Sequence, residues 1–351
     1  MPLLEVKNLE VAFKTRGGIV RAVNSVSYTL EAGRTLGIVG ESGSGKSVSA
    51  MSILGLLDRN GYIAGGEIWF DGVDLTKLDD ESLRRIRGNR ISVIFQEPMT
   101  SLNPVFSIRK QLSEPFVIHG GMTKKEAYQK CVEALRAVRI PSPESVARQY
   151  PHQLSGGMRQ RVMIAMALAA SPDILIADEP TTALDVTVQA EILRLMQNLQ
   201  RDNGTAILFI THDLGVINEM ADDVAVMYFG QVVELTSAKT LFTDCPVSHP
   251  YTEGLMLSVP RLDGVKRHLT SIPGSVPQPF ERIDGCKFSP RCPYATEKCL
   301  REEPLLLEVR RGQAIRCFYP EKEVRRREEH KKIAVNQEFN EAFSAREGKS
   351  F

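Results

Sequence analysis

A glycine-rich segment near the N-terminus carries the residue types that bind a polyphosphate. Gly40–Ser47 reads G-E-S-G-S-G-K-S, follows the apolar run Thr35–Val39 and opens a helical pattern that continues to about Leu57. A strand, a glycine loop and a helix N-terminus in this order surround phosphate groups with backbone N–H donors. The flanking patterns favour this function over a chance glycine-rich turn. The expected nucleotide contacts in the segment are Gly40, Glu41, Ser42, Gly43, Ser44, Gly45, Lys46 and Ser47.

Two adjacent carboxylates follow a second apolar strand pattern, Ile174–Ala177. Adjacent acidic residues at a strand end commonly form the solvated rim of a loop. Downstream of a phosphate-binding loop, they predict phosphoryl-transfer chemistry. We expect Lys46 to pair with the β- and γ-phosphates, and Ser47 to ligate Mg²⁺. Asp178 is expected to hold Mg²⁺ through water, and Glu179 to orient and deprotonate the attacking water.

Two further polar residues follow buried-strand patterns and complete the expected catalytic set. His212 lies just after the apolar run that contains Phe209, where its side chain could reach the γ-phosphate. Gln96 follows Ile91–Phe95 and fits the role of contacting Mg²⁺ or the attacking water. A single histidine at a strand end is more often structural, so the assignment of His212 depends on the neighbouring motifs.

These motifs resemble those of the ABC ATPase family over the first two thirds of the chain. The resemblance implies an α/β fold with a P-loop ATPase core, and ATP hydrolysis with His212 at the switch position. It also implies that Phe13 stacks on adenine and that Asp185, in the segment 183–185, lies along a dimer seam. The segment that caps the ATP bound to a partner subunit is Leu154, Ser155, Gly156, Gly157 and Met158.

Composition agrees with a globular chain of more than one domain. The chain has 351 residues, 42% hydrophobic residues and a net charge of +1, so global charge gives no reason to expect nucleic acid as a partner. No apolar run approaches the roughly 18–20 residues that span a bilayer, and the N-terminus shows no secretory signal. We expect a cytoplasmic protein that reaches the membrane through a partner.

The pattern of elements divides the chain into three regions. Residues 1–235 are expected to form the nucleotide-binding domain, with an antiparallel β subdomain near the N-terminus and a helical subdomain over about 97–171. Residues 236–320 form a Cys-rich C-terminal extension, and residues 321–351 a tail of mixed charge that is solvated and partly helical or disordered.

Within the helical region, Thr123–Glu126 is a capping box that opens a helix running to about Arg139. Three aromatic residues of this region are candidates for a groove that receives a helix of a membrane subunit. Core packing is an equal alternative for Phe106 and the favoured one for Phe116 and Tyr128.

Four cysteines cluster in the C-terminal extension: Cys286, Cys292, Cys299 and Cys317. Disulfides are disfavoured in a cytoplasmic chain, and unrelated free thiols are disfavoured by the clustering. A site of four thiolates is the best interpretation. Zinc usually brings a C-x₂-C pair, which is missing here, whereas a [4Fe–4S] cluster tolerates wider spacing. Spacing alone leaves the two metals open.

The extension resembles that of ATPase subunits of oligopeptide and dipeptide importers, whose relatives import nickel, glutathione or oligosaccharides. The resemblance rests on His249-Pro-Tyr-Thr252, Pro273-Gly-Ser-Val-Pro277 and Pro290-Arg-Cys-Pro293. Two segments depart from the subgroup's pattern: Gln278–Gly285 lacks a proline before the glycine, and Gln313 replaces the usual histidine. The resemblance implies a [4Fe–4S] cluster on the four cysteines.

The same resemblance implies the partners and the location of the chain. They are a second, related ABC ATPase subunit, two membrane permeases and, indirectly, an extracytoplasmic solute-binding protein, with the chain peripheral on the cytoplasmic face of the cell membrane. A soluble ABC protein of translation or repair is the competing class. Those proteins carry two cassettes or a long coiled coil, and this sequence has neither. The sequence therefore predicts an ATPase that powers uptake of di- or oligopeptides.

Overall fold

A sheet of eight strands forms the centre of the molecule, in the order β11-β12-β10-β9-β3-β8-β7-β6. The computed structural model describes residues 2–96, 101–182, 184–243, 245–258, 271–278 and 280–325. Strands β9, β3, β8, β7 and β6 run parallel, whereas β10, β12 and β11 continue the sheet in antiparallel pairing. Their bounds are β3 Thr35–Val39, β6 Ile91–Ile94, β7 Ile174–Asp178, β8 Ala206–Thr211, β9 Asp223–Tyr228, β10 Gln231–Ser237, β11 Leu307–Arg310 and β12 Gln313–Ile315.

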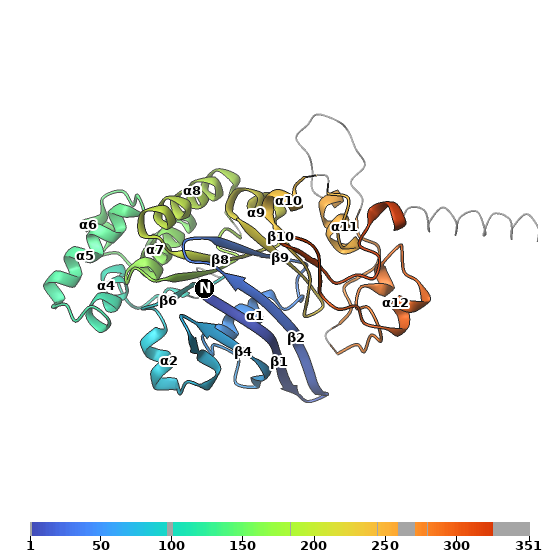
Figure 1. The fold of residues 1–351 in the computed structure, drawn as a ribbon. Coiled ribbons are helices and arrows are strands. Elements are labelled where there is room, and N and C mark those ends of the chain that lie inside the picture. The colour runs from blue at the N-terminus through green and yellow to red at the C-terminus, as the bar shows by residue number, and fades with distance from the viewer. Residues whose placement is uncertain are drawn as a thin grey trace, which may run out of the picture.

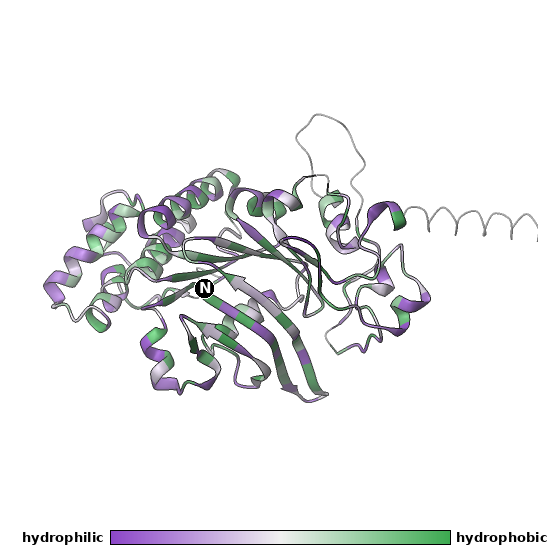
Figure 2. Cartoon of the chain, in the orientation of Figure 1, coloured by the Kyte–Doolittle hydropathy of each residue, from purple (hydrophilic) through white to green (hydrophobic). Residues whose placement is uncertain are grey.

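Both faces of this central sheet are covered, which explains why its strands read as continuous apolar runs. Successive residues of a strand point to opposite faces. In β8, Ile207 and Phe209 join one hydrophobic cluster, and Leu208 and Ile210 join the other. All residues of β3, β7 and β8 are buried. The core is therefore two apolar layers separated by the sheet, whose strands are largely hydrophobic in Figure 2.

An antiparallel sheet covers one of these faces, in the order β2-β1-β4-β5. Its strands are β1 Leu4–Thr15, β2 Gly18–Leu30, β4 Gly61–Phe70 and β5 Val73–Asp74. The hairpin of β1 and β2 pairs Leu4 with Leu30 and closes where Thr15 pairs with Gly18. This sheet confirms the β subdomain that the sequence predicts near the N-terminus.

Most of the helices cover the other face or extend from one end of the molecule (Figure 1). The helix that follows the glycine-rich segment and the one at residues 80–86 pack instead on the side of the antiparallel sheet. The helical region contains α4, α5, α6 and α7, within the predicted range of about 97–171, of which residues 97–100 lie outside the described part. The helices are α1 Lys46–Ile53, α2 Asp80–Ile86, α4 Ile108–Ile118, α5 Lys124–Ala137, α6 Pro143–Val146, α7 Gly156–Leu168, α8 Val186–Asn203, α9 Leu214–Met220, α10 Ala238–Leu241, α11 Pro250–Ser258 and α12 Glu297–Arg301. Short 3₁₀ segments span Leu75–Lys77, Pro151–Gln153 and Ser289–Arg291.

The C-terminal extension is joined to the ATPase core by the central sheet itself. The predicted boundary at residue 235 falls inside β10, and β12 pairs with β10 by matching Glu234 with Ile315 and Leu235 with Ala314. Gln313 Nε2 donates a hydrogen bond to the buried Glu234 carboxylate over 3.0 Å. The extension lies at the opposite end of the molecule from α4–α6 (Figure 1). Because β12 pairs with β10, the extension and the core share the central sheet.

Candidate active site

The glycine-rich segment connects β3 to α1, as the sequence predicts. Gly45 caps the N-terminus of α1 with a φ of 94°, in the left-handed region that favours glycine. A Cβ on Gly40 would lie 2.1 Å from the carbonyl oxygen of Met227, so only glycine fits there. Lys46 Nζ donates hydrogen bonds to the carbonyl oxygens of Gly40 and Glu41, over 2.7 and 2.9 Å. The loop thus curls around the lysine ammonium group.

The structure brings two residues predicted to hold Mg²⁺ into direct contact. The Ser47 hydroxyl donates a hydrogen bond of 2.9 Å to Asp178 Oδ1, from the start of α1 to the end of β7. Asp178 is buried, and burial raises the pKa of its carboxyl, although the Ser47 hydrogen bond opposes the shift. A hydroxyl and a carboxylate are hard oxygen ligands of the kind that Mg²⁺ prefers.

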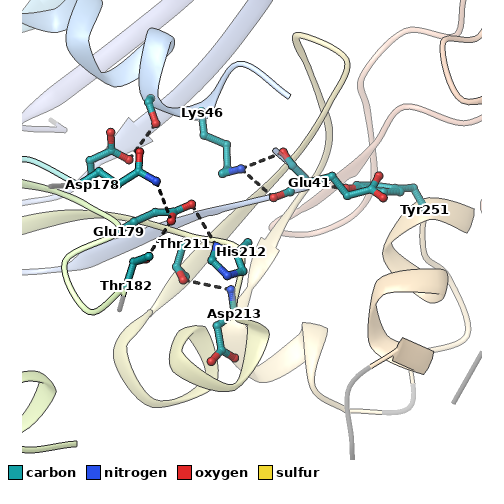
Figure 3. A network of polar contacts seen from close by, with 12 residues as sticks. Glu41, Lys46, Asp178, Glu179, Thr182, Thr211, His212, Asp213 and Tyr251 are labelled. Carbon is teal, nitrogen blue, oxygen red and sulfur yellow. Dashed lines mark hydrogen bonds and ion pairs between the residues drawn. The ribbon is translucent and has the colours of Figure 1, made fainter. Parts of the chain in front are cut away.

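Glu179 is held by three side chains at the end of β7 (Figure 3). Thr182 Oγ1 and Gln96 Nε2 donate to Glu179 Oε2 over 2.9 and 3.2 Å, and His212 Nδ1 lies 3.1 Å from Glu179 Oε1. Burial acts to raise the Glu179 pKa, but the hydrogen bonds from His212 and Thr182, together with the Lys46 charge, outweigh it and lower the pKa. The carboxylate is therefore ionised and oriented.

The backbone of Glu179 is strained. Its φ is 46°, which a non-glycine residue rarely adopts, and such strain persists at sites that the surrounding structure over-determines. Its N–H donates to the Ile210 carbonyl over 2.9 Å, which anchors the turn to β8. The turn therefore holds the Glu179 carboxylate at the carboxyl end of the parallel strands, where ligands bind in sheets of this kind.

An open cavity of about 500 Å³ joins these groups. Burial lowers the pKa of Lys46, although the charges of Glu179, Asp178 and Glu41 act to raise it. The cavity is lined by Val39, Gly40, Glu41, Ser42, Gln96, Glu179, His212, Leu214 and Leu255. The phosphate-binding loop and the three expected catalytic side chains therefore face one space.

The predicted signature segment lies apart from this cavity, at the start of α7. Ser155 caps the helix by accepting a hydrogen bond of 3.3 Å from the Met158 N–H. Leu154 is buried, whereas Ser155 and Gly156 are exposed. No residue from Leu154 to Met158 is among those that line the cavity described above. The backbone donors of this helix start are thus available to a ligand outside the chain's own site.

The remaining predicted contacts fall in four different places. Asp185 caps α8 by accepting a hydrogen bond from the Val188 N–H over 3.0 Å, and residue 183 lies outside the described part. Phe13 is half-buried on β1 and packs closely against Gly61. Phe116 is 8% exposed and belongs to the core, and Tyr128 packs against it. Phe106 is 37% exposed, so core packing does not account for it.

The four clustered cysteines line one small cavity of the extension. None forms a disulfide, and the Tyr319 N–H lies 3.4 Å from Cys317 Sγ. Burial raises the pKa of Cys292 to about 12 and that of Cys317 to about 11. Over the described residues, no group of three or more His, Cys, Asp or Glu side chains is placed to hold a metal ion.

Comparisons with known proteins agree with this geometry. A model of the ABC transporter family matches residues 23–182, and a model of the oligopeptide/dipeptide transporter C-terminal region matches residues 233–299. The oligopeptide transport ATP-binding protein AppD of Bacillus subtilis is 51% identical over 92% of this chain and 98% of its own length. OppD of Haemophilus influenzae is 51% identical over 90% of this chain and 97% of its own length. The chain belongs to the ABC transporter family, with the oligopeptide/dipeptide C-terminal region.

Solved structures of ABC proteins share the fold of the core. The ATP-binding cassette MJ0796, solved as a dimer bound to ADP and Pi in a post-hydrolysis state, is 30% identical, with a TM-score of 0.61 over 67% of this chain and 98% of that one. The protein cbiO1 from Clostridium perfringens, part of the transporter complex cbiONQ, is 28% identical, with a TM-score of 0.58 over 69% of this chain and 91% of that one.

Some contacts of the ABC core cannot be predicted from its sequence motifs. Thr182 donates to Glu179, although only its position after the carboxylates hints at a role. Glu41 in the phosphate-binding loop bonds to Arg291 and Tyr251 of the extension, more than 200 residues away. No local pattern predicts such pairs.

No helix in the described part of this ABC protein is long and apolar enough to cross a membrane.

Proposed function

We propose that this chain hydrolyses ATP to drive the import of di- and oligopeptides. The observation that carries the proposal is the ionised Glu179, held by Gln96, Thr182 and His212 beside the phosphate-binding loop. The C-terminal region and the two oligopeptide relatives support peptides as the cargo. This chain supplies the ATP hydrolysis that powers the transporter, and the sites that bind the cargo belong to other subunits.

The phosphate-binding loop and the strand ends beside the cavity fit a bound Mg²⁺–ATP. Backbone N–H groups of Gly43–Ser47 would surround the β-phosphate, and Lys46 would exchange its two carbonyl partners for phosphate oxygens. The Ser47 hydroxyl would ligate Mg²⁺ and Asp178 would hold it through water; when bound, Mg²⁺ neutralises charge on the phosphates. Phe13 is proposed to stack on the adenine.

Glu179 is proposed to accept a proton from the attacking water. A carboxylate that is ionised and fixed by three donors is prepared for this role. The partners have different tasks. His212 would orient Glu179 and reach toward the γ-phosphate. Gln96 would hold Glu179 and contact Mg²⁺ or the attacking water.

A second ATPase subunit is needed to complete the site, because Leu154–Met158 lie outside the chain's own cavity. We infer that this subunit is a related chain that forms a heterodimer, with Asp185 along the seam. Two permeases would bind the ATPase pair on the cytoplasmic face of the membrane, where the exposed Phe106 is a candidate contact.

Growth on peptides tests the proposal. A strain lacking the gene should not grow on di- or oligopeptides as the sole source of a required amino acid, while free amino acids still support growth. The strain should also resist toxic peptide analogues. Wild-type protein should restore growth, and the Glu179→Gln variant should not. If the strain takes up peptides normally but loses uptake of nickel, glutathione or oligosaccharides, peptides are not the cargo, and the function as an importer ATPase still stands.

We also propose that the four clustered cysteines hold a [4Fe–4S] cluster. Their thiols line one cavity without a disulfide, and the Tyr319 N–H near Cys317 Sγ is of the kind that stabilises a cluster thiolate. Each thiolate of a cubane binds a different iron, so a cluster holds thiolates further apart than a single zinc ion does. The missing C-x₂-C pair, which zinc sites usually bring, favours iron over zinc.

Metal analysis tests the cluster. Protein purified without oxygen should be brown and contain about four irons and four labile sulfides per chain. Cys292→Ser should remove the colour, whereas Cys245→Ser, outside the cavity, should keep it. If the protein contains stoichiometric zinc and no iron, the four cysteines form a structural zinc site and not a cluster. If it contains neither metal, the cysteines do not form a metal site.

A further inference from the structure

An ion pair joins the C-terminal extension to the phosphate-binding loop. Arg291 Nη1 lies 2.7 Å from Glu41 Oε2, and Arg291 Nη2 lies 3.0 Å from Glu41 Oε1. Each carboxylate oxygen thus accepts one hydrogen bond in the paired geometry that favours arginine over lysine. The Arg291 side chain is only 5% exposed. The Glu41 side chain is 28% exposed, so the pair is partly sheltered and water screens it less than a fully exposed ion pair.

The guanidinium group of Arg291 makes two further contacts that hold it in this position. Its Nε donates a hydrogen bond of 2.9 Å to the Pro273 carbonyl. Its centre lies 5.8 Å from the ring centroid of Tyr228, within cation–π range. Arg291 ends the 3₁₀ segment Ser289–Arg291 and directly precedes Cys292. The extension therefore presents a fixed positive charge to the loop.

Glu41 is fixed from the opposite side as well, between Lys46 and Tyr251 (Figure 3). Its N–H donates a hydrogen bond of 2.9 Å to the hydroxyl of Tyr251. Tyr251 is fully buried and packs against Tyr228 and Phe288, with ring centroids 4.7 and 5.5 Å away. The Glu41 carbonyl accepts the hydrogen bond from Lys46 described above. The side chain, N–H and carbonyl of Glu41 are all engaged.

An acidic residue at this position is an electrostatic problem for nucleotide binding. Glu41 lines the same cavity as Glu179, and its charge already acts on the Lys46 ammonium group. An unpaired carboxylate there would repel the triphosphate. We propose that Arg291 is a positioning residue for ATP that acts through Glu41: from the C-terminal extension it neutralises the Glu41 carboxylate, so that the phosphate-binding loop does not repel the triphosphate. The proposal rests on the ATP site proposed above.

A set of variants of the full chain tests this assignment through ATP binding. Arg291→Met removes the charge and should raise the Kd for Mg²⁺–ATP about tenfold, which corresponds to about 1.4 kcal/mol. Adding Glu41→Gln to that variant removes the uncompensated carboxylate and should recover most of the lost affinity. Glu41→Gln alone leaves an uncompensated arginine near the phosphates and should bind ATP several-fold more tightly. The matched control is Arg301→Met, which removes an exposed arginine of α12 and should change nothing.

A purely structural role would give a different pattern. Loss of packing in the extension would weaken ATP binding equally in Arg291→Met and in the double variant, and that result overturns the proposal. An unchanged Kd for Mg²⁺–ATP in Arg291→Met overturns it as well. If Arg291→Met is not recovered as folded protein, Glu41→Gln decides alone, and unchanged affinity in that variant overturns the proposal. Failure of the wild-type chain to bind ATP would instead reject the ATP site itself.

Discussion

At the residue scale, we expect turnover to depend most on Glu179. Its carboxylate accepts hydrogen bonds from Gln96 and Thr182 and lies beside His212. Glu179→Gln keeps the size and hydrogen-bonding capacity of the side chain but removes the base, so hydrolysis should fall about 10²–10⁴-fold while ATP binding persists.

Phosphate release measures this effect best in a complex whose partner subunit has lost its own catalytic glutamate, because the remaining turnover then comes from this chain's site. Glu133→Gln, an exposed substitution on α5, is the control and should leave turnover unchanged. Undiminished phosphate release from Glu179→Gln contradicts the role of Glu179.

Two glycines of the phosphate-binding loop should respond unequally to alanine. A Cβ on Gly40 would lie 2.1 Å from the Met227 carbonyl oxygen, a contact that the backbone cannot relieve without moving β9. Gly43 also has a positive φ, 79°, but no heavy atom lies within 4 Å of its Cβ position. Gly43→Ala should therefore cost about 1–2 kcal/mol of backbone strain. Gly40→Ala should cost more than that. Urea unfolding compares them, and equal losses would contradict the steric argument.

The residues of the site divide into those that local patterns predict and those that they do not. Lys46, Ser47 and Asp178 were predictable because a phosphate-binding loop and a strand end need fixed residue types at fixed spacing. The Arg291–Glu41 pair was not predictable, since 250 positions separate its members and neither stands in a pattern that requires the other. Long-range polar pairs of this kind depend on the tertiary fold.

At the element scale, β12 completes a buried polar network in the central sheet. Gln313 Nε2 donates to Glu234 Oε1, and Glu234 is 1% exposed. Gln313→Leu would leave a carboxylate oxygen buried without this donor, which should lower the free energy of unfolding by about 1–3 kcal/mol. Gln129→Leu on the exposed face of α5 is the control, expected within about 0.5 kcal/mol of wild type. Equal stability of the two variants, measured by urea unfolding, contradicts the network's importance.

Elements with strong end signals were predicted well. The capping box of Thr123 and Glu126 is formed, and α5 follows it closely. The helix expected to reach Leu57 ends instead at Ile53, because Gly55 adopts a left-handed φ of 61° and turns the chain. The short strands β11 and β12 were missed, since strands this short carry little periodicity of their own.

At the scale of the whole molecule, the α/β core with its β and helical subdomains was predictable from the order of strand and helix patterns. The attachment of the extension was not. Composition alone separates it from the core at about residue 235, whereas the sheet continues from β10 into β12. Because the extension shares this sheet and contacts Glu41, events in the extension and at the nucleotide have a direct physical route between them.

The position of the signature segment makes a last prediction about assembly. Ser155 lies at the N-terminus of α7, outside the chain's own cavity, so it should serve the nucleotide of the partner subunit. Ser155→Arg should therefore abolish hydrolysis at the partner's site, whereas Lys46→Ala should abolish it at this chain's own site. Vanadate trapping of the ADP formed from labelled azido-ATP, followed by photo-crosslinking and separation of the two subunits, reports which site has lost turnover.

The loss of a helix cap needs its own control, because replacing Ser155 also costs about 1 kcal/mol of helix stability. Thr123→Arg removes the cap of α5 at similar cost and should leave both sites active. If Ser155→Arg and Lys46→Ala silence the same subunit's nucleotide, the site is built within one chain and the shared-site arrangement is wrong. If they silence opposite subunits, each nucleotide lies between two chains, and one chain alone cannot complete a turnover.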